Sequence, residues 1–322
     1  MEKTKARYGT LGRFIAKHSP LFILAVLCIA LAAASPVFRS SGNLQGVAQR
    51  TAVVGVMAVG QLAVILTAGI DLSVGSVAAL SGVVGCLAMV NYSVPTPLGI
   101  AVGAGVGLLC GLVNGVLVAK GRIPPFIVTL GMMMVARGFS LTFSGAVAVS
   151  GLPPAFAWLG GARGWWLPTG IMFGYAIVMA VVLNFTRFGR TLYAVGGNRE
   201  AARLSGIPVD RVRIAAFALC GASAGFAGMM LASRTSIASP TAAEMYELYA
   251  IAACVIGGAS LMGGEGGALA AVAGALIMTV LRNFCNLQNI NVHWQQILVG
   301  ALLILLVFYD NRRKRKAGLL KE

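Results

Sequence analysis

The residue of this chain whose type and position best suit chemistry is Asp71. It stands in a joint, residues 67–76, between two apolar segments, and Ser73 follows it closely. A carboxylate there can accept N–H bonds from the first turn of the next helix, because helix N-termini carry unpaired donors and partial positive charge. It could instead contact a moving solute. We favour the capping role and keep solute contact as the alternative.

Two further polar residues lie inside apolar segments, where polar groups are costly and therefore often functional. Asn114 can form a hydrogen bond between helices or face a pathway. Arg137 must find a carbonyl, an acid or water, and structural pairing is favoured over solute binding. The path or gate predicted from this reasoning comprises Gly69, Ile70, Asp71, Leu72, Ser73, Asn114 and Arg137.

Motifs for covalent or metal-assisted catalysis are missing from the sequence. It contains no Gly-x4-Gly-Lys-Ser/Thr, the loop that cradles nucleotide phosphates. There is no His-Glu-x-x-His and no Gly-x-Ser-x-Gly, and the nine carboxylates lie mostly in loops and tails. The six cysteines are dispersed, and the two histidines lack ligand spacing. We therefore expect no catalytic residue, no metal site and no cofactor in this chain.

The elements that must position these residues are membrane-spanning helices. The chain is 58% hydrophobic and only 11% charged, with a mean hydropathy of +0.86. Its apolar segments recur at roughly the 20-residue length that spans a bilayer as a helix. We predict an all-α polytopic membrane protein with a single transmembrane domain, residues 20–310, of about ten spans. The spans are 20–38, 51–69, 73–92, 98–118, 126–144, 168–186, 214–233, 248–262, 267–284 and 295–310.

The formal charge of +16 is concentrated in an N-tail (1–19), residues 120–122, residues 187–213 and a C-tail (311–322). Basic residues gather in cytoplasmic loops, so an even number of spans places both termini and all these clusters in the cytoplasm. Nucleic-acid binding is disfavoured, because no soluble domain is present to carry a groove reader. A cleavable signal peptide is the alternative to a retained first span.

A polar segment, residues 187–213, interrupts the apolar pattern. Two glycines permit turn geometry, Asn198 can cap a short helix over 200–205, and a glycine with a proline ends it. The shallow, alanine-rich face of this helix suits a cleft in a protein, although a helix lying on lipid is the alternative. We predict a docking element for a soluble partner. Its residues are Gly196, Gly197, Asn198, Glu200, Ala201, Ala202, Leu204, Gly206 and Ile207.

Two Gly-rich joints, residues 67–76 and 256–267, are typical of broken helices rather than ordinary loops. Non-helical backbone at membrane depth persists only where protein or a water-filled cavity satisfies its polar groups. Both joints are therefore predicted to line a pathway. Glu244 and Glu247 are predicted to lie outside, where they either form salt bridges to a soluble partner or are simply solvated.

Four motifs in a distinctive order carry a family resemblance: residues 65–76, 118–127, 195–207 and 247–258. They resemble the motifs of sugar permeases of the ribose type, the membrane subunits of bacterial ATP-binding-cassette importers for monosaccharides. Branched-chain amino-acid permeases are more distant relatives. The resemblance covers residues 40 to 310 and is specific to the family rather than to one sugar. Ala68 stands where the family often has glycine.

The resemblance implies a type II importer-like bundle in the bacterial inner membrane, with two permease copies around one path. It implies a separate cytoplasmic ATPase that binds ATP and Mg²⁺ and couples through residues 196–207. A periplasmic binding protein would deliver ribose or a related monosaccharide. The alternatives are a stand-alone ion-coupled transporter, for which Asp71 is almost the only suitable acid, and a permease for branched-chain amino acids.

Overall fold

The computed structural model describes residues 19–316, and every regular element in this range is helical. Residues 1–18 and 317–322, which hold nearly all of the predicted N-tail and half of the predicted C-tail, lie outside the described residues. The helices are α2 (Ser19–Ala34), α3 (Ser41–Leu66), α4 (Val74–Asn91), α5 (Thr96–Ala119), α6 (Pro125–Ser144), η1 (Pro154–Trp158), α7 (Trp166–Phe185), α8 (Arg187–Gly197), α9 (Arg199–Leu204), α10 (Val209–Thr235), α11 (Tyr246–Ile256), α12 (Ala268–Leu287) and α13 (Val292–Lys316).

Seven of these helices are long and apolar enough to cross a membrane: α3, α4, α5, α6, α7, α10 and α12. This confirms an all-α polytopic membrane protein. The other three predicted spans correspond to shorter apolar stretches in α2, α11 and α13. The number of about ten spans therefore stays a prediction.

The predicted span over 248–262 is wrong in its extent. α11 ends at Ile256, and Gly258 turns the chain with a φ of +87°, a left-handed conformation that glycine adopts without steric clash. The 11 residues of α11 rise only about 16 Å, roughly half the thickness of the hydrocarbon layer. α11 is therefore a half-helix followed by the second Gly-rich joint.

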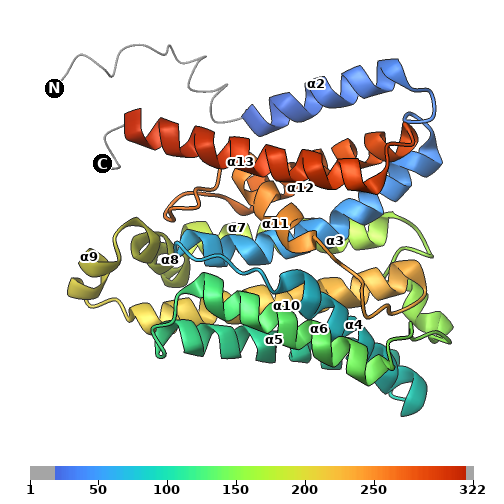
Figure 1. The fold of residues 1–322 in the computed structure, drawn as a ribbon, viewed down its shortest axis with the longest axis horizontal. Coiled ribbons are helices and arrows are strands. Elements are labelled where there is room, and N and C mark those ends of the chain that lie inside the picture. The colour runs from blue at the N-terminus through green and yellow to red at the C-terminus, as the bar shows by residue number, and fades with distance from the viewer. Residues whose placement is uncertain (1–18, 317–322) are drawn as a thin grey trace.

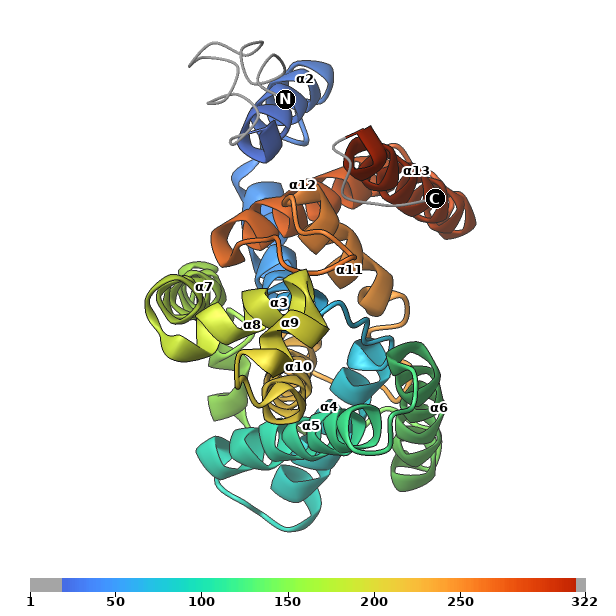
Figure 2. The ribbon, with the colours of Figure 1, turned by 90° about the vertical axis from the view of Figure 1, so that its left-hand side faces the viewer.

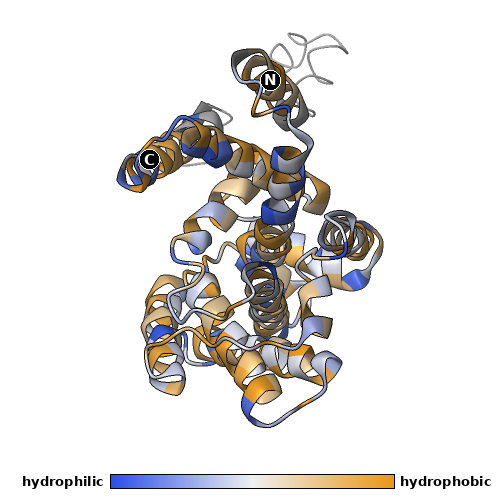
Figure 3. Ribbon diagram, turned by 90° about the vertical axis from the view of Figure 1, so that its right-hand side faces the viewer, coloured by the Kyte–Doolittle hydropathy of each residue, from blue (hydrophilic) through white to orange (hydrophobic). Residues whose placement is uncertain are grey.

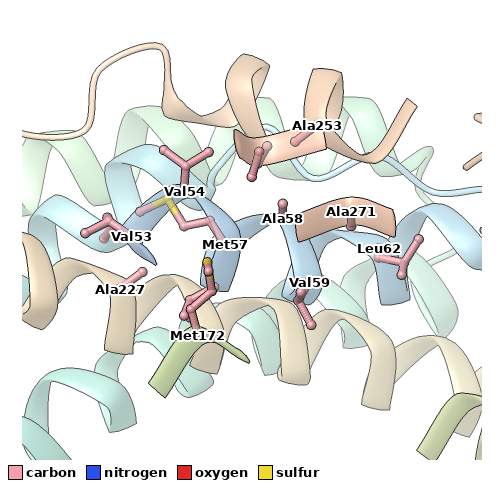
Figure 4. Close-up of a cluster of buried hydrophobic side chains, with 14 of the residues drawn as sticks. Val53, Val54, Met57, Ala58, Val59, Leu62, Met172, Ala227, Ala253 and Ala271 are labelled. Carbon is pink, nitrogen blue, oxygen red and sulfur yellow. The ribbon is translucent and has the colours of Figure 1, made fainter. Parts of the chain in front are cut away.

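α3 is the central helix of the bundle. Its residues from Thr51 to Leu66 are all buried, as expected for a helix surrounded by protein. Figure 4 shows Val54, Met57 and Val59 of α3 among side chains from α7, α10, α11 and α12. The end of α3 is thus held from all sides, so the joint that follows it starts from a fixed point.

Glycines bring α5 against α10, the most extensive helix pair of the fold. Gly103, Gly107 and Gly111 recur at every fourth position of α5 and face α10. A methyl group added at Gly107 would lie 2.7 Å from the Cα of Gly225, closer than carbon atoms can approach. Small residues at this spacing let the backbones touch, and the resulting van der Waals contact holds helices together in lipid.

One end of the bundle carries α8, α9, the loop between α5 and α6, and the C-terminal end of α13 (Figures 1 and 2). That loop holds Lys120 and Arg122. Figure 3, seen from the opposite end, shows most of the helical ribbon in the hydrophobic colour. Three basic regions therefore share one end, which we call the α9 end, and the charge pattern predicts that this end is cytoplasmic.

Candidate functional site

The polar segment 187–213 forms two short helices and the start of α10. α8 buries Leu192 and Val195 against the bundle. Asn198 caps α9, its side chain accepting an N–H bond from Ala201 at 2.9 Å. Gly206 then takes a φ of +79°, the left-handed conformation that commonly ends helices. The cap and the stop predicted from the sequence are confirmed.

α9 presents one face to the bundle and the other to the outside. Ala202 is 4% exposed, whereas Leu204 is 81% exposed and Ala201 is also exposed. Ile207, just beyond the helix, is half-buried and packs against the core. The predicted apolar face is therefore divided: Ala202 anchors α9 to the bundle, and Ala201 and Leu204 face outward.

The expectation that Gly196 and Gly197 supply turn geometry is wrong. Both residues lie in the last turn of α8, and neither has a positive φ. Gly196 serves close packing instead, because a methyl group there would collide with the carbonyl oxygen of Leu66 and lie 2.6 Å from the nitrogen of Gly264. A methyl group at Gly197 would meet nothing within 4 Å among the residues described. Only the first glycine of the pair is sterically required.

Three segments far apart in the sequence meet at Gly196. The nitrogen of Gly264, in the second Gly-rich joint, donates to the carbonyl of Leu66, the last residue of α3, at 3.1 Å. The hydroxyl of Tyr193 in α8 donates to the carbonyl of Gly266 at 2.8 Å. Burial raises the pKa of Tyr193 above its ordinary value, so this hydroxyl keeps its proton and stays a donor. We call the contact of Leu66, Gly196 and Gly264 the three-way junction.

Sequence reasoning found each segment of the three-way junction but missed that they touch. The available signal was a glycine pair in the docking segment and another in the second joint. The contacts are between backbones, with no long side chain between them to absorb a displacement. A displacement of α8 at Gly196 would therefore push on the end of α3 and on the second joint.

The first joint runs from the α9 end back into the bundle before α4 begins (Figure 1). Asp71 is 1% exposed, and its Oδ1 accepts hydrogen bonds from the nitrogen of Ser73 at 2.8 Å and from the Ser73 hydroxyl at 2.6 Å. Nδ2 of Asn114, in α5, donates to the same hydroxyl at 3.0 Å. The carboxylate thus fixes the turn immediately before α4, and Asn114 supplies an interhelical hydrogen bond.

Arg137 bonds to carbonyl groups. Its Nη1 donates to Pro240 at 2.6 Å and to Ala242 at 3.1 Å, and the hydroxyl of Ser140 donates to Pro240 at 3.3 Å. These bonds tie α6 to the loop that precedes α11. Arg137 therefore has the structural partners that its burial requires.

The two acids predicted for docking differ in position. Glu244 is exposed, while Glu247 is half-buried in the first turn of α11. The Glu247 carboxylate lies against Gly75 in the first turn of α4. Only Glu244 points away from the bundle, so Glu247 connects the half-helix α11 to the element that follows the Asp71 turn.

The described residues, 19–316, contain no group of three His, Cys, Asp or Glu side chains that could hold a metal ion. What the site offers is mechanical: an exposed two-residue face on α9, backbone contacts at the three-way junction, and two bent joints leading into the bundle. Such an arrangement can transmit a movement from the surface to the interior.

Comparison with known proteins identifies the family of the chain. Residues 43–307 match the family described as branched-chain amino acid transport system / permease component. The chain belongs to this permease family. The permease is 40% identical over 314 residues to the ribose import permease protein of Escherichia coli (strain K12), which covers 96% of this chain and 97% of that relative.

Two further relatives extend the similarity. The permease is 37% identical over 301 residues to the ribose import permease protein of Bacillus subtilis (strain 168), covering 92% and 93% of the two chains. It is 35% identical over 358 residues to the xylose transport system permease protein of Escherichia coli (strain K12), covering 92% and 91%. No solved structure matches. The resemblance to ribose-type permeases that the motifs indicate is confirmed.

Proposed function

We propose that this permease is the membrane subunit of an ATP-binding-cassette importer that moves a monosaccharide across the bacterial inner membrane. Its similarity to ribose and xylose permeases over nearly the whole chain supports a sugar. The family description names branched-chain amino acids, which makes an amino acid the second candidate substrate. ATP and Mg²⁺ would bind in a separate ATPase chain.

The observation that carries the coupling mechanism is the three-way junction. An ATPase that binds the outward face of α9 moves α9 and, through it, α8. Gly196 then presses on Leu66 and Gly264, whose backbones it touches. The end of α3 leads into the Asp71 turn and α4, and the second joint leads into α12. A push at the surface can thereby switch the interior between outward and inward access.

The remaining partners follow from this orientation. The α9 end faces the cytoplasm together with both termini, and the opposite end receives a periplasmic sugar-binding protein, for which Glu244 is an exposed contact. A second copy of the permease completes the path. The exposed apolar side chains along α5, α6 and α7 are suited to lipid or to that second copy.

The coupling proposal is tested with Ala201→Glu in permease reconstituted with its ATPase and binding protein. A carboxylate buried without a partner at the interface is costly, so sugar-stimulated ATP hydrolysis should fall at least about tenfold. Ala201→Ser is the control, because it keeps the size and adds no charge. The amount of permease in the membrane should be equal for both variants. Unchanged hydrolysis in Ala201→Glu would show that α9 is not the dock.

Vesicles that contain the permease alone test the importer itself. Sugar uptake driven by a proton or sodium gradient, without any ATPase, would contradict the proposal and support an ion-coupled carrier. In the complete complex, competition of uptake by a monosaccharide is expected, and competition by leucine alone would favour the amino-acid candidate.

A further inference from the structure

Three arginines from different helices line one cavity of about 180 Å³ between α3, α10, α11 and α12. They are Arg50, Arg234 and Arg282. Arg234 is in the last turn of α10, whose first residues follow α9, so the cavity lies far from the α9 end. Asn283 and Asn286 add amide groups to the lining. The cavity is therefore polar and strongly basic at the end proposed to face the periplasm.

None of the three guanidinium groups has a carboxylate partner among the residues described. The ion pair present in the described part of the chain joins Arg199 to Asp210 at the α9 end, away from the cavity. Arg50 donates to the carbonyl of Gly46 in its own helix at 3.1 Å. Nε of Arg234 is buried and makes no hydrogen bond within residues 19–316. Three like charges around one cavity repel unless a counter-charge is supplied, so a bound anion would lower the electrostatic energy of the cavity.

Aromatic rings fix the third arginine. The Arg282 guanidinium lies 5.0 Å from the ring centroid of Tyr249 and 5.8 Å from that of Tyr246, within the range of cation–π attraction. Both tyrosines are in the first turn of α11. Their rings hold the cation in place without neutralising it, because an aromatic face carries no net charge.

The half-helix α11 adds a second source of positive potential. Its N-terminal turn, with Tyr246 and Tyr249, forms part of the cavity wall. Helix N-termini carry partial positive charge, and half-helices in transporters direct such ends at anionic substrate groups. The nearest acid on this turn, Glu247, has its carboxylate against Gly75 of α4.

We propose that this cavity binds the acidic group of the transported sugar, so that the substrate is a monosaccharide bearing a carboxylate, such as a uronic or aldonic acid. Guanidinium groups bind carboxylates in a bidentate manner. The rings of Tyr246 and Tyr249 suit the apolar face of a sugar. The identification of the ligand as substrate rests on the proposed importer function; the anion-binding cavity itself does not.

The first test measures the local potential and needs neither ATPase nor transport. Asn286 is exposed at the cavity, so Asn286→Cys can react with small thiol reagents. Permease in nanodiscs is treated with a negatively charged and a positively charged methanethiosulfonate. The anionic reagent should be favoured at least about threefold over its preference at Ser150→Cys, an exposed loop position, and Arg282→Gln should reduce that ratio. Equal ratios at the two positions would overturn the proposal.

The second test identifies the ligand. D-galacturonate, D-glucuronate and D-gluconate are each compared with the neutral parent sugar for slowing the labelling of Asn286→Cys. At least one acid should protect where its neutral parent does not, and Arg282→Gln should remove the protection while Arg282→Lys restores part of it. The unsubstituted chain, with its native cysteines, gives the background.

Other outcomes of the second test contradict the proposal. Equal protection by a neutral parent sugar would mean that the charge is not recognised. Protection by phosphatidylglycerol in the nanodisc without any sugar acid would assign the cavity to a lipid headgroup. Protection by the binding protein free of sugar would assign it to an acidic side chain of that protein. No protection by any acid would also overturn it. A failure of ATP-driven uptake would leave all these labelling results interpretable.

Discussion

At the residue scale, a few positions determine how the backbone packs and bends around the junction and the first joint. Gly196 is such a position, because its missing side chain leaves room for the backbones of Leu66 and Gly264. Ala68 is another: it takes a φ of +57°, a left-handed conformation that is strained for alanine. Asp71 holds the next turn through two short hydrogen bonds. Gly196 permits a close backbone contact, whereas Ala68 and Asp71 shape the bend between α3 and α4.

We expect Gly196→Ala to uncouple the permease. The added methyl group collides with the Leu66 carbonyl, so α8 must shift away from the three-way junction. Sugar-stimulated ATP hydrolysis by the complete complex should fall severalfold or the purified permease should melt at lower temperature. Gly197→Ala is the matched control, since a methyl group there meets nothing within 4 Å among described residues. Equal behaviour of the two variants would contradict the packing role of Gly196.

Asp71→Asn and Asp71→Ala separate the shape of the carboxylate from its charge. The asparagine oxygen can still accept from Ser73, whereas alanine leaves buried donors unpaired, which costs about 1–3 kcal/mol of unfolding free energy. We expect thermal unfolding to shift strongly in Asp71→Ala and weakly in Asp71→Asn. ATP-driven uptake should persist in Asp71→Asn. Loss of uptake with normal unfolding would instead show that the charge acts on a solute or an ion.

At the scale of elements, small residues at helix contacts and the half-helix α11 shape the bundle, beside a core of buried apolar side chains. α5 and α10 approach through glycines at every fourth position. α11 stops after 11 residues, which places a helix N-terminus and a bent joint inside the fold. In the proposed mechanism, the bent joints carry the movement and the glycine-packed helix pairs stay together.

Gly107→Leu should weaken the α5–α10 pair. Its side chain would have to enter the space occupied by Gly221 and Gly225, and overpacking of this kind costs about 1–3 kcal/mol. Gly105→Leu adds the same side chain two residues away, where a methyl group meets nothing within 4 Å in the described chain. We expect a lower melting temperature in detergent for the Gly107 variant only. Similar melting of both would show that the glycine contact does not hold the pair.

At the scale of the whole molecule, three basic regions share one end of the bundle, while the arginine cavity lies away from that end. The α5–α6 loop, α9 and the C-terminal end of α13 lie at the same end of the bundle, although they are far apart in the sequence (Figure 1). The arginine cavity and the exposed Glu244 belong to other parts of the fold. Energy input and substrate entry are therefore proposed for opposite ends.

Thiol labelling across the membrane checks this arrangement. Ser205→Cys, beside α9, should react with an impermeant maleimide only in inside-out vesicles. Ser150→Cys, in the loop after α6, should react only in right-side-out spheroplasts. The unsubstituted chain, whose six native cysteines are buried or half-buried, gives the background. Labelling of both positions from one side would contradict the predicted alternation of spans.

The sequence alone determined the membrane class, the family and the local stop and cap signals. Hydrophobic length, charge position and residues such as Asn198 and Gly206 act through neighbours in the chain or through the bilayer, so they can be recognised without a fold. It also marked Asp71 and the two Gly-rich joints as special, because polar groups and glycines at membrane depth need a reason.

Only the tertiary structure decided which of these residues act together. The packing role of Gly196 depends on its contacts with Leu66 and Gly264. Arg234 contributes to a basic cavity only because the fold places it beside Arg50 and Arg282. The division of the α9 face between Ala202 and Leu204 likewise depends on what lies beneath the helix. Such contacts join positions tens to hundreds of residues apart, and helical periodicity carries no information about them.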